Sequence, residues 1–546
     1  MRNSCWFGCL LVVWIGAGCL TNAQSAPVES HHHAVSEKEV GSVHFATSCS
    51  SAVQADFQRA VALLHSFQYE QTAAAFAAIS AKDPQCAMAQ WGVAMSHYHG
   101  LWHNGDAGAG REALHKAQEI AAQNPATTAR ERAYIASLSE IYKEDGKDEY
   151  SHAQAFEQKM GALQAAYPDD IEAAIFHALA LDVTAPKTDK TFSNQRKCGE
   201  ILEPIFAAQP NHPGVAHYLI HCYDNPVLAE KGLGAARKYA AIAPASAHAN
   251  HMPSHIFTRV GSWEESIASN LRSAQLARAD EATSSNGEAR DQRLHAMDYL
   301  EYAYLQTGRV SDARSVLEQM NSLPPLAANL TLTGDYALAA IPARYTLELG
   351  KWDDAARLQP VTASVPWAQA ISWTAVGLGS ARSHNLARAA EAERNLASLR
   401  DTAQPKSVYW SSQIEVQRRE VAAWIAQASA KPDDAIAGMR SAAELEESMD
   451  KDAVTPGAVV PARELLAQLL QSQDRPQESL KEYEAVLKIA PNRFNALWGA
   501  AWSAEAAGNA TLASSYFRKL AAVGVGTERQ ELETARKKSG AVAQGH

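Results

Sequence analysis

Residues 474–492 read DRPQESLKEYEAVLKIAPN, and this stretch decides the fold. Its apolar side chains, among them Tyr483 and Leu487, recur at three- and four-residue spacing, which predicts one amphipathic helix. Pro476 stands at the start of that pattern, where a helix tolerates proline, and Pro491 closes it. The stretch therefore predicts a single short helix with a defined beginning and end.

The same pattern returns along the chain with a period of 34 residues. Pro210 and Pro244 are separated by this period, as are Asp474 and Gly508. Similar turns occur at Gly261-Ser262-Trp263, Gly308-Arg309-Val310 and Gly350-Lys351-Trp352. Strand signals are nearly absent after residue 53. A single helix hairpin cannot bury its apolar face alone, so repeated hairpins stack and share a core. We therefore predict an all-α solenoid of stacked antiparallel helix hairpins.

These hairpins resemble tetratricopeptide repeats (TPRs) over roughly residues 50–525. The resemblance implies a right-handed superhelix whose concave groove holds a peptide or protein partner. Several stretches also resemble a group of exported bacterial TPR proteins of no established activity; they are residues 44–49, 91–96, 217–221, 251–257 and 454–457.

Composition and motifs narrow the function further. The chain has 546 residues and a formal charge of −11 without any basic block, which argues against a nucleic-acid partner. It contains no phosphate loop, no dinucleotide-binding glycine motif and no nucleophile-elbow serine. The sequence therefore offers no catalytic residue.

The N-terminus is typical of a secretory signal. Arg2 precedes an apolar stretch, residues 6–20, that is short for a membrane span and is followed by small polar residues. Two processing routes are possible. One is cleavage after Ala23, and the other is lipid attachment at Cys19, in which case the lipid would be the chain's contact with the membrane. A retained membrane anchor is the third alternative. Either processing route predicts an exported protein, periplasmic or a lipoprotein of the outer membrane or cell surface. We expect the domains to be a signal (1–23), a tether (24–50), N-terminal hairpins (51–125), a central histidine-rich region (126–330), C-terminal hairpins (331–525) and a tail (526–546).

Four of the seven cysteines lie beyond the signal region, at Cys49, Cys86, Cys198 and Cys222. An even number of cysteines in an exported protein permits two disulfides, with three possible connectivities. We favour Cys49–Cys86 with Cys198–Cys222. Free buried thiols are the alternative.

Histidines form the most specific pattern in the sequence. His217 and His221 are four residues apart and share one helix face, and His251 and His255 repeat that spacing one period later. Neutral imidazoles with a carboxylate suit zinc, copper or iron. A metal site would therefore use His217, His221, His251, His255, His295 and Asp298. Two alternatives stay open: the histidines line a groove for an organic or peptide ligand, or they make structural hydrogen bonds.

Further side chains are expected to line the groove, namely Asp224, His99, Glu464 and Gln468. Pro253 lies between His251 and His255, so it either kinks their helix or marks a helix start near Met252. The first expected function is an exported scaffold that holds a peptide or protein partner. The alternative is a metal-binding protein or metalloenzyme that uses the histidines.

Overall fold

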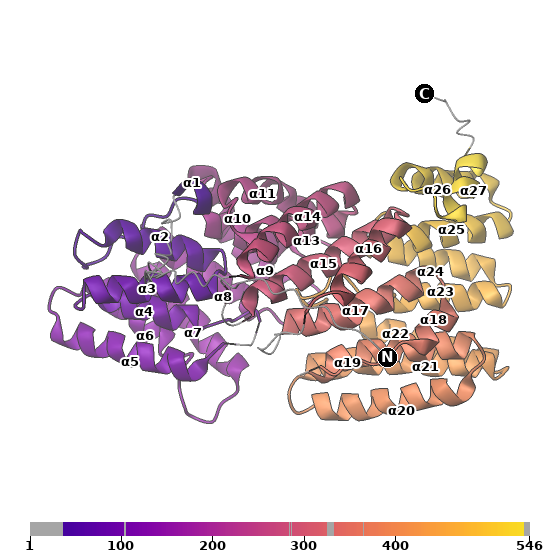
Figure 1. The fold of residues 1–546 in the computed structure, drawn as a ribbon, viewed down its shortest axis with the longest axis horizontal. Helices are drawn as coiled ribbons and strands as arrows, with labels where there is room; N and C mark the ends of the chain where they lie inside the picture. The colour runs from indigo at the N-terminus through magenta and orange to yellow at the C-terminus, as the bar shows by residue number, and fades with distance from the viewer. Residues whose placement is uncertain are drawn as a thin grey trace, which may run out of the picture. The chain divides into compact units, whose positions relative to one another are not determined.

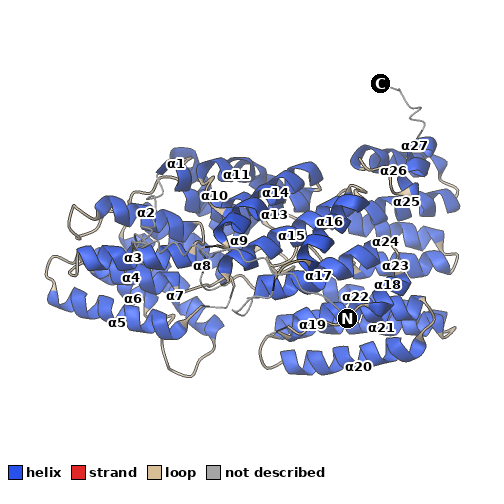
Figure 2. Ribbon diagram, viewed as in Figure 1, coloured by secondary structure: helices blue, strands red, loops and turns tan. Residues whose placement is uncertain are grey.

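The computed structural model describes residues 37–102, 105–282, 284, 287–324, 332–363 and 365–539. Within these ranges every regular element is an α-helix and no strand occurs (Figure 2). The prediction of an all-α solenoid is therefore confirmed. The expected signal sequence, Cys19 and the cleavage site lie outside the described residues. Among the helices described, none combines the length and the apolar composition that a membrane crossing requires.

Consecutive helices pack side by side as antiparallel hairpins (Figure 1). The first group comprises α1 (Glu37–Val40), α2 (Gln54–His65), α3 (Tyr69–Lys82), α4 (Ala87–Ser96), α5 (Ala107–Gln123), α6 (Ala129–Leu138), α7 (Glu149–Ala166), α8 (Ile171–Val183) and α9 (Ser193–Ala208). The central group comprises α10 (Pro213–Tyr223), α11 (Ala229–Ile242), α12 (Ala247–His251), α13 (Pro253–Val260), α14 (Trp263–Asp280), α15 (Glu288–Gln306) and α16 (Val310–Asn321). The last group comprises α17 (Leu332–Glu348), α18 (Trp352–Arg357), α19 (Pro366–Arg382), α20 (Leu386–Ala403), α21 (Val408–Ala428), α22 (Pro432–Glu447), α23 (Ala462–Ser472), α24 (Pro476–Ile489), α25 (Phe494–Ala506), α26 (Ala510–Val523) and α27 (Gln530–Lys538).

One turn conformation recurs between the two helices of a hairpin. The residue two places before the second helix has a positive φ, a left-handed conformation that favours glycine because it lacks a Cβ. The residues in this position are Phe67, Gly261, Gly308, Gly350, His384, Ala430, Asp474 and Gly508. The turns expected from the sequence therefore occupy equivalent places in the fold.

The C-terminal hairpins also contact the central ones. Helix α25 packs against α15, and the Trp263 indole donates a hydrogen bond to the Asn492 carbonyl at 3.0 Å. Arg493 is fully buried and donates to the Glu464 carboxylate at 2.6 Å. Glu464 is itself fully buried, so the expectation that it lines an open groove is wrong.

The segment between α22 and α23, residues 448–461, contacts the central hairpins and is called the crossing loop below. The Arg344 guanidinium in α17 donates to the carbonyls of Gly457 and Ala458, both at 3.1 Å. It also donates to the Thr455 hydroxyl at 2.9 Å and to the Asp298 carboxylate at 3.0 Å. Arg344, which belongs to the C-terminal half of the sequence, thus pairs with Asp298, and its other hydrogen bonds hold the crossing loop against the central hairpins.

Both ends of the described chain are packed, which corrects the expected tether and tail. Val40, Val43 and Phe45 are almost completely buried within the range assigned to the tether. In the range assigned to the tail, α27 buries Leu532 and Ala535. Disulfides join Cys49 to Cys86 and Cys198 to Cys222.

The recurring turn predicts opposite effects of exchanging glycine and alanine. Gly508→Ala is expected to lower the free energy of unfolding by about 1 kcal/mol, because alanine is strained at the φ of 80° found there. An added Cβ at Gly508 meets no atom within 4 Å, so the effect comes from the backbone alone. Ala430→Gly, at a φ of 58°, is expected to raise stability by up to about 1 kcal/mol. Urea unfolding midpoints measure both changes.

The matched control is Gly234→Ala in the interior of α11. An added Cβ there also meets no atom within 4 Å, and alanine is expected to stabilise this helix by about 0.5–1 kcal/mol. A loss of stability in Ala430→Gly would contradict the role assigned to the turn.

Candidate metal centre

Six histidines from four neighbouring helices form two triads. The first triad contains His217 and His221 of α10 with His248 of α12. The second contains His251 of α12, His255 of α13 and His295 of α15. Within each triad, one ring nitrogen of every histidine lies within 4.8 Å of the other two. The structure thus brings all five predicted histidines into triads and adds His248, which the sequence analysis did not include.

A break at Met252 divides the histidines between the triads. Helix α12 ends at His251 and α13 begins at Pro253, since proline lacks the N–H that would continue the first helix. His248 consequently faces His217, 31 residues away, instead of His251 at the full repeat distance. The single metal site expected from the sequence is therefore replaced by two separate groups of histidines.

The triads are closed off from solvent, which corrects the expectation that these histidines line an open groove. Each of the six side chains is 6% exposed or less. Burial lowers the pKa of His217 to about 3 and also lowers the pKa of each of the other five. At neutral pH the imidazoles are uncharged, so each has one N–H and one nitrogen lone pair.

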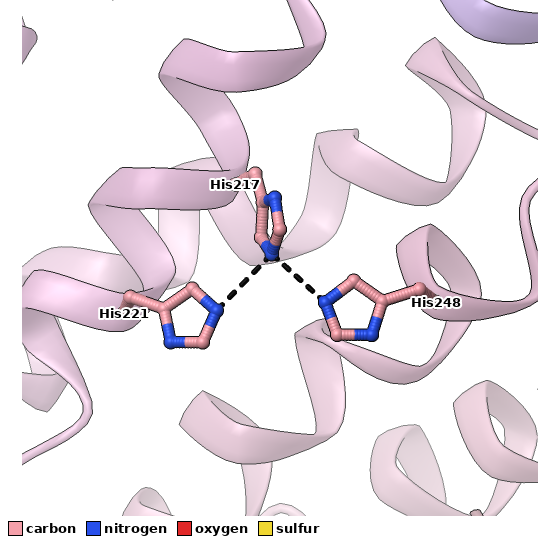
Figure 3. A group of neighbouring side chains, drawn as sticks. All are labelled: His217, His221 and His248. Atoms are coloured by element: carbon pink, nitrogen blue, oxygen red, sulfur yellow. Dashed lines mark hydrogen bonds between the residues drawn. The ribbon is translucent and has the colours of Figure 1, made fainter. Parts of the chain in front are cut away.

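Hydrogen bonding fixes the tautomer of His217 in the first triad. Its Nδ1 lies 2.6 Å from the carbonyl oxygen of His65, which only accepts, so Nδ1 carries the proton and Nε2 the lone pair. The Nε2 atoms of His221 and His248 lie 3.1 and 3.0 Å from that same nitrogen. Both contacts meet at the same ring nitrogen of His217 (Figure 3). One lone pair accepts one good hydrogen bond, so a second approaching nitrogen has no comparable partner.

The second triad has a sharper conflict. His255 Nδ1 donates to the Asp224 carboxylate at 2.9 Å, which leaves the lone pair on Nε2. His251 Nδ1 lies 2.7 Å from Asn270 Oδ1, and the Asn270 amide nitrogen donates to the Ser266 carbonyl at 2.9 Å. Asn270 Oδ1 is therefore the acceptor, and His251 also has its lone pair on Nε2. These two Nε2 atoms are only 2.9 Å apart.

His295 completes the second triad without resolving this conflict. Its Nε2 atom is buried and has no hydrogen-bond partner among the residues that the structure describes. A buried ring nitrogen without a partner is costly, and two facing lone pairs repel each other. A cation between the three rings would remove both penalties.

Asp224 orients the second triad from outside. Besides His255, its carboxylate accepts from Arg259 at 2.8 Å and from Lys451 of the crossing loop at 2.7 Å. Although burial opposes ionisation, the charges of Lys451 and Arg259 hold the pKa of the Asp224 carboxyl well below its usual range. A charged Asp224 is the kind of outer partner that fixes the ring orientation of a metal-binding histidine.

A third buried cluster shows the contrasting arrangement. His65 Nε2 and His212 Nε2 each lie 2.8 Å from a different oxygen of the Glu172 carboxylate. Here nitrogen faces oxygen, so ordinary N–H hydrogen bonds satisfy the contacts. We therefore assign this cluster a structural role, in contrast to the two triads where nitrogen faces nitrogen.

The remaining predicted residues lie apart from the triads. His99 stacks on Tyr69 with ring centroids 3.9 Å apart. Gln468 accepts a hydrogen bond from Arg382 at 2.7 Å. Asp298, predicted as a metal ligand, instead pairs with Arg344 as described above. The sequence analysis missed His248, although its position three residues before His251 is a signal that could have identified it, and nothing in the sequence pointed to Lys451.

The contacts of Asp224 predict a large loss of stability when its charge is removed. Asp224→Asn keeps the shape but leaves Lys451 without its paired charge and Arg259 with Asp450 alone, and burying unpaired charge is costly. We expect unfolding to become easier by about 3–5 kcal/mol, measured by urea denaturation at pH 7. Adding Lys451→Met should recover part of that loss.

Asp401→Asn is the control, because Asp401 pairs with Arg400 at the surface, where their side chains are 69% and 32% exposed. The same change there is expected to cost less than about 1 kcal/mol. Equal losses for the two variants would show that the Asp224 network adds no stability.

Comparison with known proteins gives little guidance for this site. No protein-family model matches the chain, and no curated protein sequence is significantly similar to it. Among solved structures, the crystal structure of yeast Tom70 is similar at 12% sequence identity and a TM-score of 0.29. That match covers 74% of this chain and 95% of the Tom70 chain. A similarity at this TM-score supports no conclusion about function, so the functional reasoning below starts from the triads.

Proposed function

We propose that this protein is a metal-binding protein that holds one transition-metal ion in each histidine triad. The observation that carries the proposal is the 2.9 Å contact between His251 Nε2 and His255 Nε2, whose Nδ1 atoms both donate to fixed acceptors. Two neutral imidazoles in this tautomer present lone pairs to each other, which is the arrangement that a shared ion stabilises.

The distances support an ion of ordinary size. Nitrogen ligands lie about 2.0–2.1 Å from zinc, so two ligands of one tetrahedral ion are about 3.3 Å apart. The Nε2 contacts of 2.9, 3.0 and 3.1 Å in the two triads are shorter than that separation by a few tenths of an ångström. An all-imidazole ligand set suits zinc, copper or iron.

The two triads lie next to each other. The His221 and His255 rings are 6.1 Å apart between centroids, and His248 and His251 are 6.3 Å apart. Two ions held in this way would form one dinuclear centre, with no carboxylate among the direct ligands. Asp224 would remain an outer partner of His255.

The proposal also includes export to an oxidising compartment. The disulfides Cys49–Cys86 and Cys198–Cys222 support this location, because disulfides rarely persist in a reducing cytosol. A scaffold for a peptide or protein partner is the second candidate function. The array of helix hairpins favours it, but such a partner would have to use surfaces other than the buried histidines.

Metal analysis of the full chain tests the main proposal. His31, His32 and His33 are first replaced by serine, so that this run cannot bind metal. After dialysis against a chelator and reloading with zinc or copper(II), we expect about two ions per chain by mass spectrometry, one per triad. His251→Ala/His255→Ala should lose one ion and His217→Ala/His248→Ala the other. Loading should also raise the unfolding temperature.

His212→Gln is the matched control, because His212 is equally buried but faces the Glu172 carboxylate. It should keep both ions. Circular dichroism of each variant shows whether the helices remain. A folded wild-type chain that takes up no stoichiometric zinc or copper would refute the proposal.

A further inference from the structure

A second site lies outside the triads, in a cavity of about 560 Å³ between α19, α21, α22 and the crossing loop. Binding sites for small molecules typically have this size. Aromatic side chains form part of its wall, and the Trp367 and Trp410 rings stack at 5.4 Å with an angle of 9°. No histidine of either triad lines the cavity.

Two carboxyl groups also line the cavity. Glu420 of α21 is 3% exposed, and no described residue donates a hydrogen bond to it or pairs with its charge. Glu446 of α22 accepts one hydrogen bond, from the Ala462 backbone at 2.9 Å. Burial and the neighbouring Glu446 raise the pKa of Glu420, and burial raises the pKa of Glu446 to about 7. Glu420 therefore lacks a cation that would stabilise its ionised form, whereas the charges of Arg493 and Arg463 only partly offset the effect of burial on Glu446.

The positive side chains of the cavity wall do not supply that cation. Arg259 and Lys451 pair with Asp224, and Arg259 also pairs with Asp450. Lys190 donates to the Met449 carbonyl at 3.2 Å. Lys488 lies at an exposed position of the wall. Glu420 is thus an uncompensated carboxyl in a largely aromatic and aliphatic cavity, with Glu446 beside it. The Trp367 indole nitrogen and Gln417 Oε1 on the same wall also have no hydrogen-bond partner among the described residues.

We infer that this cavity binds an organic cation, with its ammonium or guanidinium group against Glu420 and Glu446 and its apolar body against Trp367 and Trp410. Carboxylates pair with such cations, and aromatic faces attract them. The cavity is large enough for an amine that carries an aromatic or aliphatic body. The inference does not rest on the metal proposal, because it uses different side chains.

Calorimetric titration of the full chain with tryptamine tests the inference. Tryptophol serves as the uncharged counterpart, since it replaces the ammonium group with a hydroxyl and keeps the indole. We expect saturable binding of tryptamine, about tenfold tighter than that of tryptophol. Glu420→Gln should remove this difference, and Glu446→Gln should reduce it.

Glu444→Gln is the matched control, because Glu444 lies on α22 near Glu446 but is exposed and does not line the cavity. It should bind tryptamine as the wild type does. Equal affinity for tryptamine and tryptophol, or no saturable binding of tryptamine, would overturn the inference. The metal content of Glu420→Gln, expected to be unchanged, separates this outcome from a failure of the metal proposal.

Discussion

The metal centre and the cavity both depend on the ion pair and the hydrogen bonds of one buried side chain, the guanidinium of Arg344. A buried charge is tolerated only when it is paired and its donors are hydrogen-bonded. Asp298 supplies the opposite charge, and Thr455, Gly457 and Ala458 supply the remaining acceptors. Those three acceptors belong to the crossing loop, which has no regular secondary structure of its own to hold it in place. Arg344 therefore links the C-terminal half of the chain to the central hairpins.

The crossing loop contacts both the surroundings of the second triad and the cavity that contains Glu420. On one side it directs Lys451 to Asp224, and the Tyr299 hydroxyl beside His255 donates to the Thr455 carbonyl at 3.0 Å. On the other side, Thr455, Gly457 and Ala458 line the cavity that contains Glu420. The loop thus contacts the surroundings of the second triad and forms part of the wall of the neighbouring cavity. A ligand that shifts Lys451 or Arg259 would act on the second triad through Asp224.

The sequence predicted the repeated part of this structure well. Helices, their proline boundaries and turns such as that at Gly308 follow from local chemistry. The residues that determine each of these elements therefore lie within the element itself or directly beside it in the sequence. The spacing of His217 and His221 predicted their shared helix face for the same reason. Equivalence between repeats failed at His251, because Pro253 ends α12 and brings His248 to the first triad.

The rest depended on contacts between distant segments. The sequence pattern placed Asp298 and Glu464 on the groove face. In the structure, Asp298 instead pairs in the interior with Arg344, 46 residues away, and Glu464 pairs with Arg493, 29 residues away. Nothing in the local pattern around Lys451 or Glu420 indicates which hairpin the loop or the cavity will meet. A repeat period predicts which side chains share a helix face. Whether that face is buried depends on which distant segment of the chain packs against it.

The position of the crossing loop in the sequence has a consequence for the order of assembly. All six histidines lie between residues 217 and 295, whereas the loop that contacts Asp224 and Tyr299 beside the second triad begins at residue 448. A chain that is synthesised or exported from its N-terminus therefore presents its complete set of imidazoles well before the covering segment arrives. An ion that entered the second triad at that stage would need no opening in the finished protein, and the last fifth of the chain would then cover it.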